Sequence, residues 1–151
     1  GLDRYDAGID GFIHIRDDID DPTSLSHPSV WAIHEDRIGD LWVGTYAGGL
    51  NVLRTAPPAI ELFRSRPGDI ATLKSNAIKA LHEDPEGRIW VGTDGGGFHL
   101  FDGGSGTFER FNRTNTSLRS DAVLSLFTDR EGYLWVGSWA GGLGRFDTET
   151  K

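Results

Sequence analysis

Three times the chain carries nearly the same seven residues: Gly39-Asp40-Leu41-Trp42-Val43-Gly44-Thr45, Gly87-Arg88-Ile89-Trp90-Val91-Gly92-Thr93 and Gly132-Tyr133-Leu134-Trp135-Val136-Gly137-Ser138. The three tryptophans stand 48 and then 45 residues apart (90 − 42 and 135 − 90). A fixed period of this length indicates a repeat architecture. We expect positions that all repeats share to be scaffold, and positions that differ between repeats to include any binding site.

Each repeat contains the same predicted strands. An apolar run is followed by a turn with Asp first and Gly fourth, such as Asp84-Pro85-Glu86-Gly87, which is the signature of a type I turn in which Gly takes a positive φ. The tryptophan strand, a glycine-rich loop, a third strand and a short fourth strand come next. No stretch shows a sustained 3.6-residue period, so we expect little or no helix.

Four short antiparallel strands in about 45 residues have the size of one β-propeller blade. We therefore predict an all-β fold in which residues 1–151 form about three blades. A plain β-sandwich would not need near-identical units, and a parallel β-helix has much shorter rungs. The predicted parts are the third and fourth strands of one blade (1–16), two whole blades (29–64 and 77–111) and the first three strands of another blade (122–147).

Composition narrows the classes of partner. The net charge of −8 argues against nucleic acid. No apolar run approaches the roughly 18 residues of a membrane span, so a membrane connection is expected only through a span outside these residues. Propellers have about four to eight blades, so we expect the partners to be further blades of the same propeller or another copy of the chain.

Two sets of repeated residues are predicted to be structural. The first set consists of Trp42, Trp90 and Trp135. Each has a ring large enough to fill the space between blades. The second set stands inside strands, where Gly is disfavoured unless a backbone approaches closely or a bulge occurs; it is Gly44, Gly92 and Gly137.

The sequence offers no chemistry for catalysis. The triplets His34-Glu35-Asp36 and His82-Glu83-Asp84 resemble a ligand set, but they are one repeat position, and the third repeat has Phe127-Thr128-Asp129 there. A metal site needs three or four converging donors, so we predict no metal. The Gly-Gly pairs lack the following helix and the Lys-Ser/Thr of a phosphate loop, so we predict no cofactor.

The divergent positions are the candidates for ligand binding. Four residues after each repeated tryptophan stand Tyr46, Asp94 and Trp139, and near the start of the innermost strands stand Trp31, Lys79 and Leu124. In a propeller these positions share a face with the connectors between blades. Rings that stack on sugars, with charged groups between them, suit an oligosaccharide. The predicted ligand-binding residues are Trp31, Tyr46, Lys79, Asp94 and Trp139, and the connectors add His27, Asn76, Arg119 and Asp121. Packing under loops is the alternative for these aromatic residues.

The repeated motif resembles the two-component regulator propeller repeat. One copy reads Arg88-Ile89-Trp90-Val91-Gly92-Thr93, then Gly96-Gly97-Phe98 and Phe101-Asp102, and the resemblance covers essentially the whole chain. In the repeat before it, Leu53-Arg54 replaces the aromatic-Asp pair and Thr55-Ala56-Pro57-Pro58 follows, so we expect that hairpin to be rebuilt.

The resemblance implies a seven-bladed propeller in the extracytoplasmic sensor region of a bacterial membrane receptor. Such regions precede a transmembrane helix and a histidine kinase or diguanylate cyclase, and several respond to polysaccharide fragments. We therefore expect a non-enzymatic, ligand-sensing segment on the periplasmic or extracellular side. The alternatives are a propeller enzyme, such as a streptogramin lyase or a glycan-cleaving protein, and a protein-interaction scaffold or self-assembling lectin.

Overall fold

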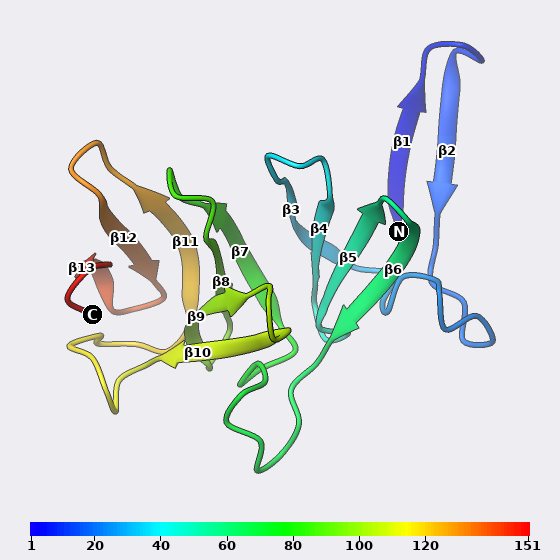
Figure 1. Cartoon of the computed structure of the whole chain (residues 1–151). Coiled ribbons are helices and arrows are strands. Elements are labelled where there is room, and N and C mark those ends of the chain that lie inside the picture. Colours follow the sequence, from blue (N-terminus) through cyan, green and yellow to red (C-terminus); the bar gives the residue numbers. More distant parts are fainter.

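The computed structural model describes residues 1–151, except for the side chain of Pro58. It contains 13 strands. Among the described residues there is no helix, and so none that is long and apolar enough to cross a membrane. The strands form two four-stranded sheets, one three-stranded sheet and one two-stranded hairpin, all antiparallel (Figure 1). The predicted all-β architecture of four-stranded propeller blades is confirmed.

The N-terminal hairpin consists of β1 (Leu2–Asp6) and β2 (Gly11–Ile15). The first blade consists of β3 (Val30–Glu35), β4 (Leu41–Thr45), β5 (Leu50–Thr55) and β6 (Pro58–Phe63). The second blade consists of β7 (Ile78–Glu83), β8 (Ile89–Thr93), β9 (Gly97–Asp102) and β10 (Thr107–Phe111). The third sheet consists of β11 (Val123–Thr128), β12 (Tyr133–Ser138) and β13 (Gly142–Asp147).

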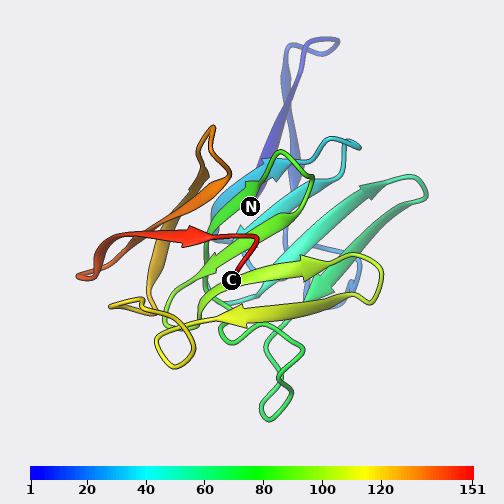
Figure 2. The same cartoon turned by 60° about the vertical axis from the view of Figure 1, so that its left-hand side comes forward.

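The innermost strands bring neighbouring blades together. Strand β3 lies against β7, and β7 lies against β11, so the sheets follow one another side by side. The hairpin β1–β2 projects away from this row of sheets in both views (Figures 1 and 2). Two apolar cores fill the spaces between successive sheets. One contains Trp42 beside Ile78 and Phe108, and the other contains Trp90 beside Val123.

The repeated aspartate has two tasks that explain the turn and the tryptophan together. The amide of Gly39, with a φ of 89°, donates to the carbonyl of Asp36 at 2.9 Å, as expected for the predicted turn. One carboxylate oxygen of Asp36 accepts the amides of Ile38 and Asp40. The other accepts the indole N–H of Trp42 at 2.8 Å. The same indole bond recurs in Asp84–Trp90 and Asp129–Trp135.

Glycine inside the tryptophan strand lets the next blade approach. A Cβ built on Gly44 would lie 2.6 Å from Cγ2 of Ile78, and one built on Gly92 would lie 2.9 Å from Cγ1 of Val123. Both distances are shorter than real Cβ contacts. The Cβ of Gly137 would instead overlap the hydroxyl of Ser125 in its own sheet. Any side chain at Gly44 or Gly92 would therefore push adjacent blades apart.

The hairpin that departs from the repeat is rebuilt, as predicted. Strands β5 and β6 pair from Leu50↔Phe63 to Thr55↔Pro58, so only two residues form the turn. Arg54 donates to Asp40 at 2.8 Å and to Glu61 at 2.7 Å. Burial raises the pKa of Asp40, but the bonds from Arg54 and Thr55 outweigh it and hold the pKa below its usual value.

Candidate functional site

A β-bulge opens the innermost strand of each of the three larger sheets. In the pairing of β3 with β4, Val30 lies opposite Thr45 and Ala32 lies opposite Gly44, so Trp31 is an extra residue. Lys79 and Leu124 are the extra residues in β7 and β11. A bulge re-aims the side chain of the extra residue and is frequent next to functional sites. The sheets thus present Trp31, Lys79 and Leu124 at equivalent points.

The loops after the tryptophan strands lie beside these bulges. The amides of Tyr46, Asp94 and Trp139 donate to the carbonyls of Ser29, Ala77 and Ala122, each one residue before its innermost strand. The connector to the next blade reaches the same place, because Gly49 donates to the carbonyl of Asn76 at 3.0 Å. We call this edge of the sheets the rim.

Five rim side chains from two adjacent blades form a connected group, which we call the rim cluster: His27, Trp31, Tyr46, Lys79 and Asp94. The rings of Trp31 and Tyr46 meet edge to face at 4.6 Å between centroids. The ring of His27 lies 5.8 Å from that of Tyr46. The ammonium of Lys79 lies 3.1 Å from the centroid of the Trp31 ring and 3.8 Å from a carboxylate oxygen of Asp94.

The rim cluster is open to solvent, and Trp139 stands apart from it. The exposed fractions are 39% for Trp31 and 51% for Tyr46, which leaves ring surface free for a ligand. Trp139 lies in the loop that follows β12 and is 70% exposed, without a ring partner among the residues that the structure describes. Four of the five predicted ligand-binding residues are thus brought together, and the fifth presents a separate ring.

Two of the other connector candidates, Asn76 and Asp121, have structural contacts, whereas Arg119 lines the cavity along β13 that is described below. The side chain of Asn76 accepts a hydrogen bond from the amide of Ser65, and its backbone carbonyl accepts one from the amide of Gly49. The side chain of Asp121 accepts the amide of Arg113, and its carbonyl accepts the amides of Gly95 and Gly97. These bonds support the alternative interpretation, that such residues shape the connectors. His27, in contrast, belongs to the rim cluster.

The residues that resembled a metal-ligand set lie away from the rim and face the next blade. His34 contacts the carboxylate of Glu83 at 3.5 Å, and His82 lies 2.9 Å from the hydroxyl of Thr128. Arg37 also binds Glu83, at 2.5 Å. Burial lowers the pKa of His82, which favours the neutral ring that accepts the amide of Thr128. Within the described residues, no three His, Asp or Glu side chains converge as metal ligands.

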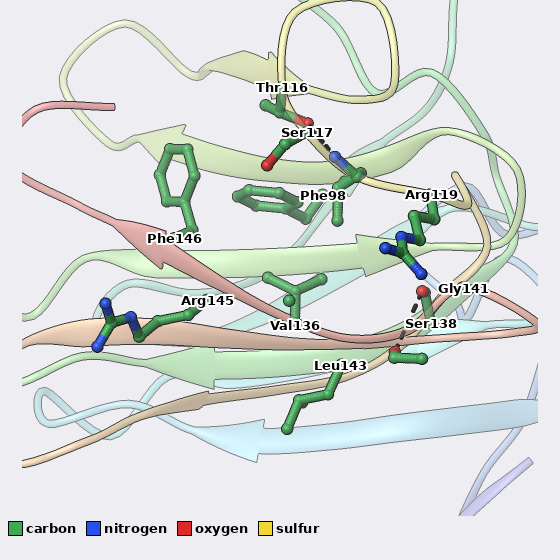
Figure 3. Close-up of a pocket in the computed structure, with 13 residues that line it drawn as sticks. Phe98, Thr116, Ser117, Arg119, Val136, Ser138, Gly141, Leu143, Arg145 and Phe146 are labelled. Atoms are coloured by element: carbon green, nitrogen blue, oxygen red, sulfur yellow. Dashed lines mark hydrogen bonds between the residues drawn. The ribbon is translucent and has the colours of Figure 1, made fainter.

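A cavity of about 510 Å³ lies along β13 (Figure 3). Phe98, Val136 and Phe146 form its apolar part, and Arg119 lies near Ser138 and Gly141 at its other end. In the two four-stranded blades, Gly49 and Gly97 face carbonyls of the fourth strand, whereas nothing lies within 4 Å of a Cβ built on Gly142. The cavity therefore corresponds to the place of a fourth strand, and we do not regard it as a ligand pocket.

The contacts inside the rim cluster could not be predicted from the sequence. The divergence of Trp31 and Lys79 marked both residues, but only the bulges and the close approach of β3 and β7 place the ammonium on the ring. No sequence signal distinguished Trp139 from Tyr46, because both stand four residues after a tryptophan.

Comparison with known proteins identifies the repeat. The family model described as two component regulator propeller matches residues 24–47, 72–95 and 117–140. Each match runs from a connector through the innermost strand, the aspartate turn and the tryptophan strand to the following loop. A search of curated proteins found no significant match.

Solved structures with a similar fold include two receptor domains and an enzyme. The extracellular domain of a hybrid two component system from B. thetaiotaomicron is 21% identical, with a TM-score of 0.87 over 99% of this chain and 21% of that one. Another such domain from the same organism is 25% identical, with a TM-score of 0.67 over 81% and 17%. Virginiamycin B lyase from Staphylococcus aureus is 14% identical, with a TM-score of 0.56 over 82% and 43%. The chain thus spans about a fifth of the receptor domains, and these similarities establish the propeller fold.

Proposed function

Because the chain carries three matches to the two component regulator propeller model, we propose that it is a ligand-sensing propeller segment of an extracytoplasmic receptor. In this proposal the rim cluster binds a glycan or another small ligand, and the receptor passes the signal to a kinase or cyclase. The role of residues 1–151 is binding and not catalysis. The similarity to extracellular domains of two component systems supports a place outside the cytoplasm.

The observation that carries the proposal is the exposed pair of rings, Trp31 and Tyr46, held beside a cation and a carboxylate. Aromatic faces provide large, rigid contact area, and buried aromatic rings dominate interface energetics. The edge-to-face contact at 4.6 Å fixes the two rings relative to each other before a ligand arrives, so little conformational entropy is lost on binding. A saccharide can stack on such rings while its hydroxyls bond to Asp94 and His27.

Tyr46→Ala tests the binding site, and Tyr5→Ala is its matched control. The two tyrosines are similarly exposed, at 51% and 54%, but Tyr5 lies on the β1–β2 hairpin, where it packs on Phe12. Titration calorimetry against a panel of neutral and acidic oligosaccharides should show binding by the wild type. Tyr46→Ala should weaken it about tenfold or more, equivalent to about 1.4 kcal/mol. Equal weakening by both substitutions, or no binding of any saccharide, would contradict the proposal.

The receptor part of the proposal has a separate test, namely the coding sequence on either side of residues 1–151. Further blades, an apolar stretch of about 20 residues and a kinase or cyclase domain are expected. A gene that encodes neither a membrane span nor an output domain would refute the receptor role and leave the binding site to be judged by calorimetry.

A further inference from the structure

We propose that the rim cluster selects an acidic saccharide, one that carries a carboxylate or a sulfate group, and that Lys79 is the residue that makes the selection. The inference rests on the proposed function, because it names the class of ligand for the same group of residues. It arises from the way in which the ammonium of Lys79 is held.

The side chain of Lys79 is mostly buried, but its ammonium makes no hydrogen bond within the described residues. Its side chain is 24% exposed. The nearest carboxylate oxygen, on Asp94, is 3.8 Å away, which is too far for a hydrogen bond. The face of Trp31, at 3.1 Å, attracts the positive charge but accepts no conventional hydrogen bond. Three N–H donors are therefore free at the edge of the ring pair.

A ligand that carries negative charge gains most from these donors. Hydrogen bonds between an ammonium and an anionic oxygen are shorter and about twice as strong as bonds between neutral groups. The hydroxyls of a neutral saccharide can accept from Lys79, but they add no charge attraction. The partial burial of Lys79 strengthens the difference, because charges interact more strongly where water is scarce.

The neighbouring side chains define how such a ligand would lie. Trp31 and Tyr46 come from the first blade and Lys79 from the second, so a sugar ring stacked on the aromatic pair reaches the ammonium across the boundary between blades. The equivalent bulge residue of the third sheet, Leu124, is 41% exposed and carries no charge. Among the three bulge residues only Lys79 is a cation, so the acidic group of the ligand can bind at only one of these positions.

The overall charge of −8 makes this local cation necessary. The chain as a whole repels an anion, so an acidic saccharide needs a cation at the point of contact. Because Lys79 and Asp94 are partly exposed, added salt should screen the attraction. The affinity for an acidic saccharide should therefore fall as ionic strength rises, and the affinity for a neutral saccharide should not.

Calorimetry with matched saccharide pairs tests the proposal. One pair is an oligogalacturonide and the same oligomer with its carboxyl groups reduced to alcohols. The other pair is a sulfated galactan oligosaccharide and its desulfated form. The acidic member of at least one pair should bind at least tenfold more tightly than its neutral member. Lys79→Gln should abolish this preference, because it should weaken binding of the acidic member at least tenfold and binding of the neutral member much less, and Lys79→Arg should retain the preference.

The opposite results would overturn the proposal. Equal affinity for both members of each pair, or loss of both affinities in a folded Lys79→Gln protein, would show that charge is not selected. If Lys79→Gln lowers the melting temperature too far, Asp94→Asn decides the matter. Removing the competing carboxylate leaves Lys79 on Trp31 and should increase the preference for the acidic member several-fold, whereas an unchanged preference contradicts the proposal. Neutral saccharides that bind and lose affinity on Tyr46→Ala, without any acidic preference, would leave the proposed function standing and refute only this inference.

Discussion

Gly44→Ala tests whether the spacing between blades is set by a missing side chain. The new Cβ would lie 2.6 Å from Cγ2 of Ile78 and 3.2 Å from Cβ of Ala32, whereas carbon atoms prefer about 3.5–4.0 Å. Overpacking of this kind costs about 1–3 kcal/mol. Reduced freedom of the unfolded chain returns about 0.4–1 kcal/mol, so we expect a net loss of about 1–2 kcal/mol. For a chain of this length the melting temperature should fall by about 2–8 °C.

Two further variants make the Gly44→Ala result specific. Gly103→Ala is the control, because the atom nearest to its Cβ is 3.7 Å away, on Phe101. It keeps the gain from the unfolded chain without the overlap, so the melting temperature should stay the same or rise slightly. Ile78→Ala removes Cγ2 but keeps the Cβ, which would lie 2.9 Å from the new methyl group. Gly44→Ala should therefore cost less in that background, by up to about 1 kcal/mol, as measured by a double-mutant cycle in denaturant unfolding. A Gly44→Ala protein as stable as the wild type, or an identical cost in both backgrounds, would refute the reasoning.

Two other stability predictions follow from buried polar groups. Asp84 is 1% exposed and accepts hydrogen bonds from Trp90 and from the side chain of Arg88, so Asp84→Ala should cost about 3–5 kcal/mol in denaturant unfolding. Asp129 occupies the equivalent position without such an arginine, so Asp129→Ala should cost about 1–3 kcal/mol. Equal costs would contradict the explanation. Burial lowers the pKa of His99 to about 4, whereas in the unfolded chain the ring binds a proton from about pH 6.5 downward. Protonation therefore favours the unfolded chain below pH 6.5. The free energy of unfolding should fall by about 3 kcal/mol as the pH falls from 6.5 to 4. In His99→Asn, the side-chain oxygen can accept the backbone amide that His99 accepts, as Asn51 does at the equivalent position of the first blade. Unfolding at several pH values should show a smaller loss of stability between pH 6.5 and 4. An unchanged pH dependence would argue against His99 as its source.

Much of the fold follows from the sequence because its determinants are local and repeated. The turn from Asp36 to Gly39 needs only nearby residues, and its pattern occurs three times. The tryptophan strand and the glycine-rich loop repeat with it, so each copy supports the interpretation of the others. The rebuilt hairpin after Leu53 was also visible, because its residues depart from the pattern. The number of blades in the whole propeller does not follow from three repeats.

The rest could not be predicted because it depends on how side chains approach one another in space, within a blade and between blades. The second task of Asp36, binding the indole of Trp42, requires knowing that the ring lies back over the turn. The contact of Lys79 with Trp31 requires two bulges and the separation of two sheets. Periodicity shows which positions are equivalent, but it does not give the distance between them.

The recurring bulge separates the evolution of binding from the evolution of stability. Trp31, Lys79 and Leu124 have no directly opposite partner in the pairing of their strands, so a new side chain there leaves the ladder of the sheet intact. Gly44 and Gly92, which face the next blade, and the aspartate turns maintain the assembly of the blades. Under the proposed function, one substitution per blade is enough to change the ligand, and duplication of a blade adds one more independently adjustable position to the surface.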